Sequence, residues 1–487
     1  MQQYLELLKV AKEHGIFKGD RTNTGTQSRF GQHARFSLHK DYNAVLPKVT
    51  TKYITQPSID HELKWVMGGD TRLEYLIANK VRIWNEWVIP GTEVWQDLTV
   101  EEIKSRLRAH VVEHIGKEHC KHDGEFTVEY TGSATSVEEL DHLAYDATLL
   151  VNSSEYAKHQ LATTVELIAK GDTDKITLNH LQTLHRVVLG SEPRKLVGGE
   201  LGPVYGKTWR NIEDVRIVPK YQWPDYEKRG FTFVIDLPGE SYLTDRCVVE
   251  RKVDQLAEVL DSLSREPTEG DGGNNRDSRR LIICAWDPRL IEDQALPPCH
   301  AFIQFWTRKL TLTERVKLLA IKESKEEAQL AAEGIIQRGK PPITDVEMMR
   351  KYIQMWKKDP VTDQILMDRL DAIHIPTRAI SCSLYQRSAD LFLGVPFNIT
   401  FYSLLTHMLA NQFNMLAEEF IWTGGDTHIY SNHQEQTDLQ LTRECYNVPE
   451  IAFRKEAVGK SILEITPEDY AITNYEYHPH IAGKVAV

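Results

Sequence analysis

The chain has 487 residues, of which 41% are hydrophobic and 26% are charged, with 28 Gly and 20 Pro. This composition excludes the disordered, collagenous and coiled-coil classes and predicts a globular protein of about three domains, or one large domain with insertions. The formal net charge of −12 also excludes the general basic surface that bulk nucleic-acid binding requires, so any anionic ligand must be held by a local cluster.

The first half of the chain alternates turn-rich and helical stretches. Residues 1–87 begin with an amphipathic helix, followed by the loop DRTNTGTQSRFG and by FSLHK and KVTTKYI, which have strand-like composition. Residues 58–77 predict a capped helix, a Gly-Gly break and a second short helix. Residues 88–198 are charged and largely helical in pattern, which predicts a helical insertion.

The second half repeats this alternation. Residues 199–310 predict strands and turns around one helix, VDQLAEVLDSL, followed by the strand LIICAW. Residues 311–376 are again charged and helical, which predicts a second insertion. Residues 377–487 predict the strand ISCSLYQRS, the long apolar helix TFYSLLTHMLANQFNML and further strands.

Location and metal content are predicted from what the sequence lacks. No apolar run approaches the about 18 residues of a membrane span, and the first helix has no signal-peptide cleavage site. The six cysteines are scattered without a CxxC pair, as in a reducing compartment. We therefore expect a soluble, cytoplasmic protein, in the host cytoplasm if it is viral. His114, His119, Cys120 and His122 match no zinc-finger spacing, so we expect no metal.

A candidate nucleophile and several arginines stand in turn-like settings. Two prolines restrict the backbone before Cys299 in ALPPCHAFIQFW, which presents the thiol from a rigid turn. The alternative is a buried structural cysteine. The planar guanidinium forks of arginine pair well with the oxygens of a phosphate dianion, and their positive charge would lower the pKa of a nearby thiol. Each arginine taken alone is commonly just a solvated side chain. They are Arg21, Arg279, Arg280 and Arg387.

Eight ordered blocks resemble the signature blocks of thymidylate synthase. The later three are PPCHAFIQFW, LYQRSADLFLGVPFNITFYSLLTHMLA and WTGGDTHIYSNHQEQTDLQL, and the earlier five are DRTNTGTQSRFG, VTTKYI, HELKWVMGGDT, IWNEW and GELGPVYGKTWR. The resemblance covers 1–87, 199–310 and 377–487, but neither insertion nor most of 211–270. It implies an α/β (α+β) catalytic domain with a twisted mixed sheet and flanking helices, one sheet face packing on a twofold mate.

The resemblance implies transfer of a one-carbon unit from 5,10-methylenetetrahydrofolate to C5 of dUMP with reduction, giving dTMP and dihydrofolate. Cys299 then matches the nucleophile that attacks C6 and makes C5 reactive. In a homodimer, Arg279 and Arg280 would serve the neighbouring subunit's phosphate site. The substrate-binding residues implied are Arg21, Arg279, Arg280, Gln386, Arg387, Ser388, Asn398, His428 and Tyr430.

Asn398 carries the base preference, because a carboxamide pairs with both N3–H and O4 of uracil, whereas the related deoxycytidylate hydroxymethylases carry Asp there. The resemblance further assigns proton movement to Glu62, Tyr205 and His300, the 3′-hydroxyl to His428 and Tyr430, and the pterin to Asp390. Each also has a plain structural alternative, in packing or solvation. The folate-binding set implied is Lys52, Trp84, Trp87, Asp390, Gly394 and Val487.

Departures from the family pattern concern the folate side. YITQPS after VTTK lacks the usual His and Arg, Asn85 replaces an Asp, and Ala389 replaces a Cys or Asn. They keep a second reading open, a dUMP hydroxymethylase in which water instead of hydride meets the methylene and tetrahydrofolate is released. A third reading, an RNA-binding or scaffold member without turnover, fits the net charge of −12 poorly.

Overall fold

The computed structural model divides the chain into two compact units, Met1–Ile89 with Glu200–Val487, and Pro90–Gly199. Among the described residues, no helix is long and apolar enough to cross a membrane. The structure describes residues 1–20, 22–103, 105–106, 120–122, 128–130, 178–189, 191–270, 272–332, 353–354, 356 and 358–486.

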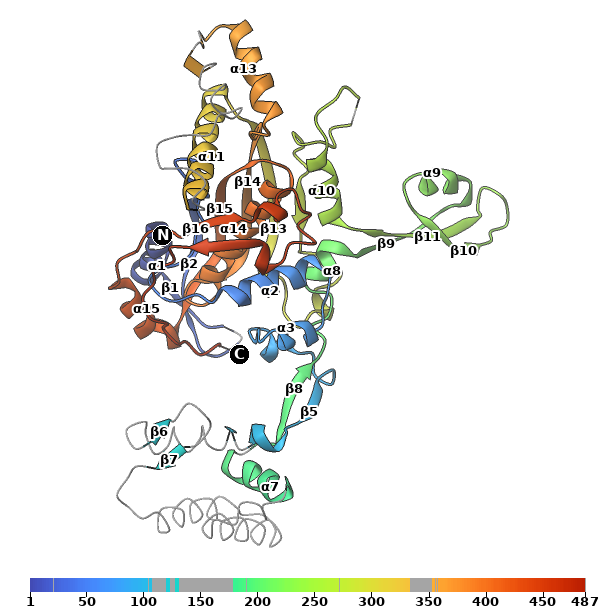
Figure 1. The fold of residues 1–487 in the computed structure, drawn as a ribbon. Helices are drawn as coiled ribbons and strands as arrows, with labels where there is room; N and C mark the ends of the chain where they lie inside the picture. The colour runs from blue at the N-terminus through green and yellow to red at the C-terminus, as the bar shows by residue number, and fades with distance from the viewer. Residues whose placement is uncertain are drawn as a thin grey trace. The chain divides into compact units, whose positions relative to one another are not determined.

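A six-stranded mixed sheet is the centre of the first unit (Figure 1). The two central strands, β14 and β15, run parallel, and every other neighbouring pair is antiparallel. This mixed sheet with flanking helices confirms the predicted fold class. The strand order is β1 (Ile16–Lys18), β2 (Thr26–Ser37), β15 (Leu416–Tyr430), β14 (Arg378–Asp390), β13 (His300–Lys309) and β12 (Ile282–Cys284).

One face of this sheet is buried under two helices, α1 (Gln2–His14) and α14 (Gly394–Gln412). Alternation along the strands places Ile303, Leu384 and Trp422 in register on the buried side, each fully buried. Helix α14 is itself buried on almost all sides, as expected of a helix that is apolar all round. The core therefore lies between the sheet and α14.

Two features differ from the sequence prediction: the start of one helix and the absence of one strand. Helix α14 begins at Gly394, upstream of the apolar run, so Asn398 lies inside its first turns. The strand expected in KVTTKYI is absent, and that prediction was wrong. Apart from the exposed Tyr53 the segment is buried, and backbone groups that a strand would pair bond side chains instead: the amide of Ile54 donates to the Tyr475 hydroxyl (3.1 Å), which donates to the carbonyl of Val49 (2.8 Å), and Arg443 Nη1 donates to the carbonyl of Thr51 (2.8 Å).

Shorter elements complete the first unit around the sheet. Helix α8 follows the segment that leads back from the second unit, and α10 is capped by the Asp254 side chain, which accepts from the amide of Ala257 (2.8 Å). The helices are α2 (Gln56–Met67), α3 (Glu74–Ala78), α8 (Tyr205–Arg210), α10 (Gln255–Ser264) and α15 (Gln434–Leu441), and the small hairpins are β3 (His39–Lys40) with β4 (Asn43–Ala44) and β16 (Glu450–Phe453) with β17 (Tyr470–Thr473).

A separate three-stranded antiparallel sheet, here called the lobe (residues 212–253), extends from α8 and α10 (Figure 1). Its own small core contains Val218, Phe231, Cys247 and Val249, with Trp223 and Tyr226 packed against it. The order is β10 (Thr232–Leu237), β11 (Arg246–Val253) and β9 (Ile212–Pro219), and the helix α9 (Trp223–Glu227) lies between β9 and β10 in sequence.

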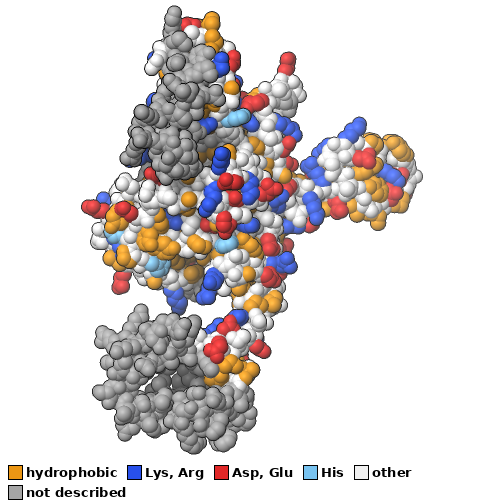
Figure 2. Space-filling view, in the orientation of Figure 1, with side chains coloured by type: hydrophobic (Ala, Val, Ile, Leu, Met, Phe, Trp, Pro, Cys, Tyr) orange, Lys and Arg blue, Asp and Glu red, His pale blue; other side chains and the backbone are white. Residues whose placement is uncertain are grey.

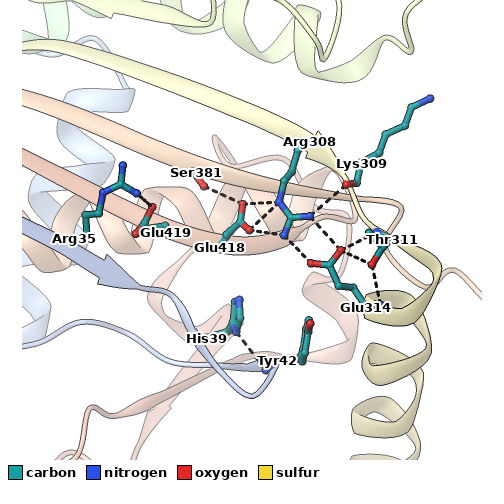
Figure 3. A network of polar contacts seen from close by, with 10 residues as sticks. All are labelled: Arg35, His39, Tyr42, Arg308, Lys309, Thr311, Glu314, Ser381, Glu418 and Glu419. Atoms are coloured by element: carbon teal, nitrogen blue, oxygen red, sulfur yellow. Dashed lines mark hydrogen bonds and ion pairs between the residues drawn. The ribbon is translucent and has the colours of Figure 1, made fainter.

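The predicted insertion 311–376 contributes two described helices, α11 (Leu312–Ala332) and α13 (Pro360–Ala372), with a shared core. Its start is tied to the main sheet by Arg308 of β13, whose Nη2 contacts Glu314 (2.8 Å) and Glu418 of β15 (2.5 Å) (Figure 3). Arg315 contacts Asp371 across the helix pair (2.5 Å). These ion pairs bridge β13, β15, α11 and α13.

The second unit pairs β5 (Val94–Asp97) with β8 (Arg194–Gly198) and contains the helix α7 (Leu178–Leu189). A small core is formed by Leu98, Ile103 and Leu181. The short strands β6 (Cys120–His122) and β7 (Val128–Tyr130) also pair. Most of the helices predicted in 88–198 lie outside the described residues.

Candidate active site

Cys299 lies in a bend directly before β13, at the end of the sheet where β14 and β15 also end. Its amide donates to the hydroxyl of Tyr205 (2.8 Å), and its carbonyl accepts from the amide of Arg387 on β14 (2.9 Å). The side chain is neither buried nor fully exposed. The bend is thus held from two sides, as the two preceding prolines predicted, and presents the thiol at a partly open position.

Arg387 holds the same bend through its guanidinium. Nε donates to the carbonyl of Pro298 (2.8 Å) and Nη2 to that of Pro297 (2.7 Å), while the group lies 5.2 Å from the ring centroid of Trp286. A permanent positive charge therefore sits beside the cysteine's turn. Such a charge stabilises a thiolate and attracts a phosphate.

Three aromatic rings cluster beside the turn of Cys299. The His300 centroid lies 5.3 Å from those of both Tyr205 and Tyr402, and Tyr402 Oη lies 3.1 Å from His300 Nδ1. Burial lowers the pKa of His300 to about 4 and raises the pKa of Tyr205 well above its usual range. Both groups are therefore neutral at pH 7, so they act as hydrogen-bonding groups and not as charges.

Glu62 extends from α2 toward the same aromatic group. The indole Nε1 of Trp84 donates to its Oε1 (2.9 Å), and Trp84 packs on Tyr205 at a centroid distance of 5.9 Å. Loss of hydration raises the pKa of Glu62 to about 7, and the Trp84 hydrogen bond only partly opposes this. A carboxyl group poised near neutrality can give and take a proton at working pH.

An amide chain runs from the sheet to α14. Trp422 Nε1 donates to Gln386 Oε1 (2.9 Å), and Gln386 Nε2 donates to Asn398 Oδ1 (3.1 Å). This chain orients the Asn398 carboxamide, because its oxygen accepts one hydrogen bond and keeps a second lone pair. Its nitrogen is left as the donor. An oriented carboxamide of this kind can pair with an N–H and a carbonyl side by side.

The parallel register of β14 and β15 places Asp390 beside His428, and Ser388 beside Asp426. His428 Nδ1 lies 3.4 Å from Asp426 Oδ1, and its ring centroid lies 5.0 Å from that of Tyr430. Hydrogen bonds from His428, Lys18 and Ser28 hold the pKa of Asp426 below its usual range, despite partial burial. His428 and Tyr430 thus reach the same sheet end as Cys299.

Asp390 and Lys52 shape the loop that enters α14. Asp390 Oδ1 accepts from the amides of Phe392 (2.9 Å) and Leu393 (3.0 Å). Lys52 is buried, its Nζ donates to the carbonyl of Phe392 and lies 3.6 Å from the Phe392 ring centroid. Burial lowers the pKa of Lys52 to about 7, and the nearby Asp390 opposes the shift. Gly394 is the first residue of α14.

The C-terminal segment is fastened beside this loop. Asn432 Nδ2 (3.1 Å) and His433 Nε2 (2.9 Å) both contact the carbonyl of Lys484. The His433 ring lies 5.0 Å from the Phe392 ring. A Cβ added at Gly483 would lie 2.7 Å from Phe392 Cε1 and 3.1 Å from His433 Nε2. The tail therefore needs glycine at position 483 to keep its contacts with Phe392 and His433.

The predicted phosphate arginines are not all brought together in one chain. Arg279 and Arg280 are exposed in the turn before β12, where the carbonyl of Arg279 accepts from Gln304 Nε2 (3.1 Å). The buried Arg378 anchors this turn through Asp277. Arg21 and Val487 lie outside the described residues.

Of the other predicted residues, Trp84 is buried and Trp87 is half-buried at the short turn Asn85–Trp87. The sequence did not point to Tyr402, Trp422 or Asp426. Tyr402 lies one helical turn after Asn398, a spacing that predicts a shared face once the helix start is known. Within the described parts of the chain, no three His, Cys, Asp or Glu side chains form a metal-binding group.

A protein-family model for thymidylate synthase matches residues 2–324 and 344–487. The match includes residues 88–198, which lie outside the blocks that carried the resemblance. Within the second predicted insertion, only residues 325–343 are unmatched. Family membership supports a folate-dependent one-carbon transfer to C5 of dUMP and makes dUMP and folate the expected substrates. With most of its length matched, and with the fold and site described above, this chain belongs to the thymidylate synthase family.

Proposed function

We propose that this chain converts dUMP and 5,10-methylenetetrahydrofolate to dTMP and dihydrofolate through a covalent bond between Cys299 and C6 of the pyrimidine. The observation that carries the proposal is the shared sheet end at which Cys299, held by Tyr205 and Arg387, meets the oriented amide pair Gln386–Asn398. A thiol, a fixed cation and an oriented carboxamide are the groups that this chemistry requires.

Cys299 would attack C6 as the thiolate, and the electron pair would move to O4 through C5. Arg387 favours the thiolate and binds phosphate, with Ser388 and, by resemblance, Arg21. Glu62, with its pKa near 7, would exchange a proton with the O4 region. Tyr205, neutral because its pKa lies well above the usual range, would hold by hydrogen bonding the water that takes the C5 proton, and neutral His300 would line the pocket near the ring. The folate substrate supplies the methylene carbon and then the hydride.

Asn398 would select uracil. Gln386 Nε2 already donates to Asn398 Oδ1, which directs the Asn398 nitrogen toward a carbonyl and leaves one oxygen lone pair for an N–H. Uracil presents O4 and N3–H in this order, whereas cytosine presents a donor and an acceptor. His428 and Tyr430 would hold the deoxyribose 3′-hydroxyl from β15.

Hydride transfer requires that water be kept from the exocyclic methylene. The indole of Trp84 is buried, and the C-terminal tail is fastened to Asn432 and His433, with folate contacts proposed for Lys52, Trp87, Asp390, Gly394 and Val487. An enclosed site of this kind protects a reactive intermediate from hydrolysis.

One observation favours the second candidate, a dUMP hydroxymethylase. Asn85 Oδ1 is buried and accepts no hydrogen bond from the described residues. Buried acceptors of this kind are usually satisfied by a partner, and a water held there, between Trp84 and Trp87, would be close to the folate side. Water attack on the methylene would give 5-hydroxymethyl-dUMP and unoxidised tetrahydrofolate.

Product analysis separates the two candidates. The full chain is incubated with dUMP and methylenetetrahydrofolate, the nucleotide is identified by mass, and dihydrofolate is followed by absorbance. We expect dTMP and dihydrofolate in equal amounts. A hydroxymethyl product without dihydrofolate establishes the second candidate, and absence of any product despite bound dUMP overturns both.

We also propose a homodimer in which Arg279 and Arg280 contact the neighbouring subunit's phosphate site. Both side chains are exposed, and their turn is anchored by the buried Arg378. Inactive Cys299→Ala chains mixed with inactive Arg279→Ala/Arg280→Ala chains should regain activity, because one hybrid site receives a thiol and intact arginines. If activity does not return although subunit exchange is demonstrated, each site is built from one chain.

A further inference from the structure

The two faces of the lobe differ in how they are covered. On one face Val218, Cys247 and Val249 are buried under Phe231, Trp223 and Tyr226. On the other face nothing in the described structure covers the side chains to the same extent. Figure 2 shows hydrophobic side chains at the surface of the lobe, with acidic and basic groups among them. A sheet face of this kind is unusual unless it binds something.

The uncovered side chains share one face because of the strand register. Ile217 pairs with Val248, and Val248 pairs with Ile235, while Arg246 pairs with Leu237. Directly opposed residues of antiparallel strands lie on the same side of the sheet. We call this surface the lobe face. Its aliphatic members are Val215, Ile217, Ile235, Leu237 and Val248, of which the first four are 54%, 67%, 54% and 38% exposed.

A basic and an acidic side chain flank this apolar surface on opposite sides along β11. On β11 the lobe face contains Arg246, then Val248 and then Glu250, with both charged side chains exposed. Glu250 pairs with Val215, and Arg246 with Pro219, so the acidic and basic ends are separated by one aliphatic row. The arrangement is basic at Arg246, apolar in the middle and acidic at Glu250, and the next row outward, Lys252 paired with Glu213, carries one charge of each sign.

We infer that the lobe face docks on the lobe face of a second copy of this chain. A twofold axis that runs across the strands at Val248, between the two sheets, places Val248 over the partner copy's equivalent position and each Arg246 opposite a Glu250. The two aliphatic rows then pack face to face, as sheets do in sandwiches. Self-complementarity of charge about Val248 is the observation that selects a second copy over an unrelated partner.

This interface is independent of the proposed reaction. It lies on the lobe, whereas the dimer expected from family resemblance uses the open face of the six-stranded sheet, so the two contacts coexist. A chain with both interfaces assembles to at least twice the mass of a chain that has only one.

Sedimentation of the full chain tests the interface by mass. Ile217→Glu introduces a charge into the apolar row and should halve the mass of the wild-type assembly or reduce it further. Val458→Glu is the matched control, because Val458 is equally exposed (67%) but belongs to a distant turn, and it should leave the mass unchanged. Equal masses for the wild type and Ile217→Glu, up to the solubility limit, overturn the inference.

A charge exchange identifies the occupant as a second copy. Arg246→Glu places acidic groups opposite each other, and Glu250→Arg places basic groups opposite each other, so each variant alone should lose the larger assembly. An equimolar mixture of the two should regain it, because every contact then joins unlike charges, and the double variant should also assemble. If either single variant keeps the larger assembly, or if neither the mixture nor the double variant regains it, a second copy does not occupy this face and the inference is overturned.

Discussion

The six-stranded sheet and the sheet of the lobe each bury one face and leave the other open, yet they do so differently. The main sheet is covered by the long buried helix α14, and its open face carries the partly exposed aromatics Phe302, Trp306 and Tyr385 among polar side chains. The lobe is covered by short elements, and its open face is an aliphatic row between opposite charges. The deep core of the main sheet supports the candidate catalytic groups at its strand ends, whereas the thin core of the lobe supports an exposed surface.

The same contrast applies to polar groups. At the strand ends of the main sheet, Gln386, Asn398 and Glu62 each have a hydrogen-bond partner from another element. On the lobe face the charged side chains Arg246 and Glu250 extend into solvent. Fixed partners pre-organise a site for chemistry, while free charges favour recognition by a second surface. Substitutions in the two regions should therefore affect different measurements.

Cys299→Ser should have the largest effect of any single change in the site, a loss of turnover on the order of 10³-fold or more, because the alkoxide is not available for attack on C6. A mixture of 5-fluoro-dUMP and methylenetetrahydrofolate should add a stable mass to the wild type but not to Cys299→Ser. Cys284→Ser, another partly exposed free cysteine, is the control and should keep both. An adduct on the Cys299→Ser variant would show that another residue forms the covalent bond.

Asn398→Asp should shift the preference between dUMP and dCMP by about 10- to 100-fold toward cytosine, which corresponds to about 1–3 kcal/mol for one mismatched buried pair. The ratio of kcat/KM values for the two nucleotides measures this. Ile217→Glu on the lobe should leave the ratio unchanged. A preference that does not move in Asn398→Asp would mean that another group reads the base.

Gly483→Ala sharpens the role of the tail. The added methyl would meet Phe392 and His433, so the tail would leave its contacts and kcat should fall by roughly 10- to 100-fold, since catalysis is sensitive to small displacements. Val485→Ala, on the same tail but partly exposed, should be nearly neutral. The fraction of hydroxymethyl product should rise in Gly483→Ala if the tail excludes water. Equal kcat values for both variants would contradict a closing role.

Glu62→Gln tests stability and not turnover, and we expect it to have the smallest effect of these substitutions. The folded-state pKa of about 7 lies above the ordinary value of 4.5, so the folded chain binds more protons than the unfolded chain between these values, and stability falls as pH rises through this window. Gln removes that cost while Trp84 keeps an acceptor. The variant should gain roughly 1–3 kcal/mol relative to wild type between about pH 5 and about pH 8. Urea unfolding at both pH values measures this, and a constant difference would refute it.

The motif-bearing residues were largely within reach of the sequence. The Pro-Pro turn before Cys299 predicted a rigidly presented thiol, and the structure shows its backbone held by Tyr205 and Arg387. Gln386 and Asn398 were identified through family resemblance, but their contact required the packing of α14 on β14 and the early start of α14. A chain position alone does not state which strand lies beside which.

Sequence alone determined the fold class and the family, because ordered motifs are local properties of the chain, and it proposed Cys299 as the nucleophile. Tertiary structure decided what depends on surroundings. The pKa values of Glu62, His300 and Lys52 follow from burial, and the missing strand in KVTTKYI follows from the side chains of Arg443 and Tyr475, which bond its backbone groups. The lobe face follows from pairing between β9, β10 and β11. Desolvation and strand register join residues far apart in sequence, so neither can be read from local patterns.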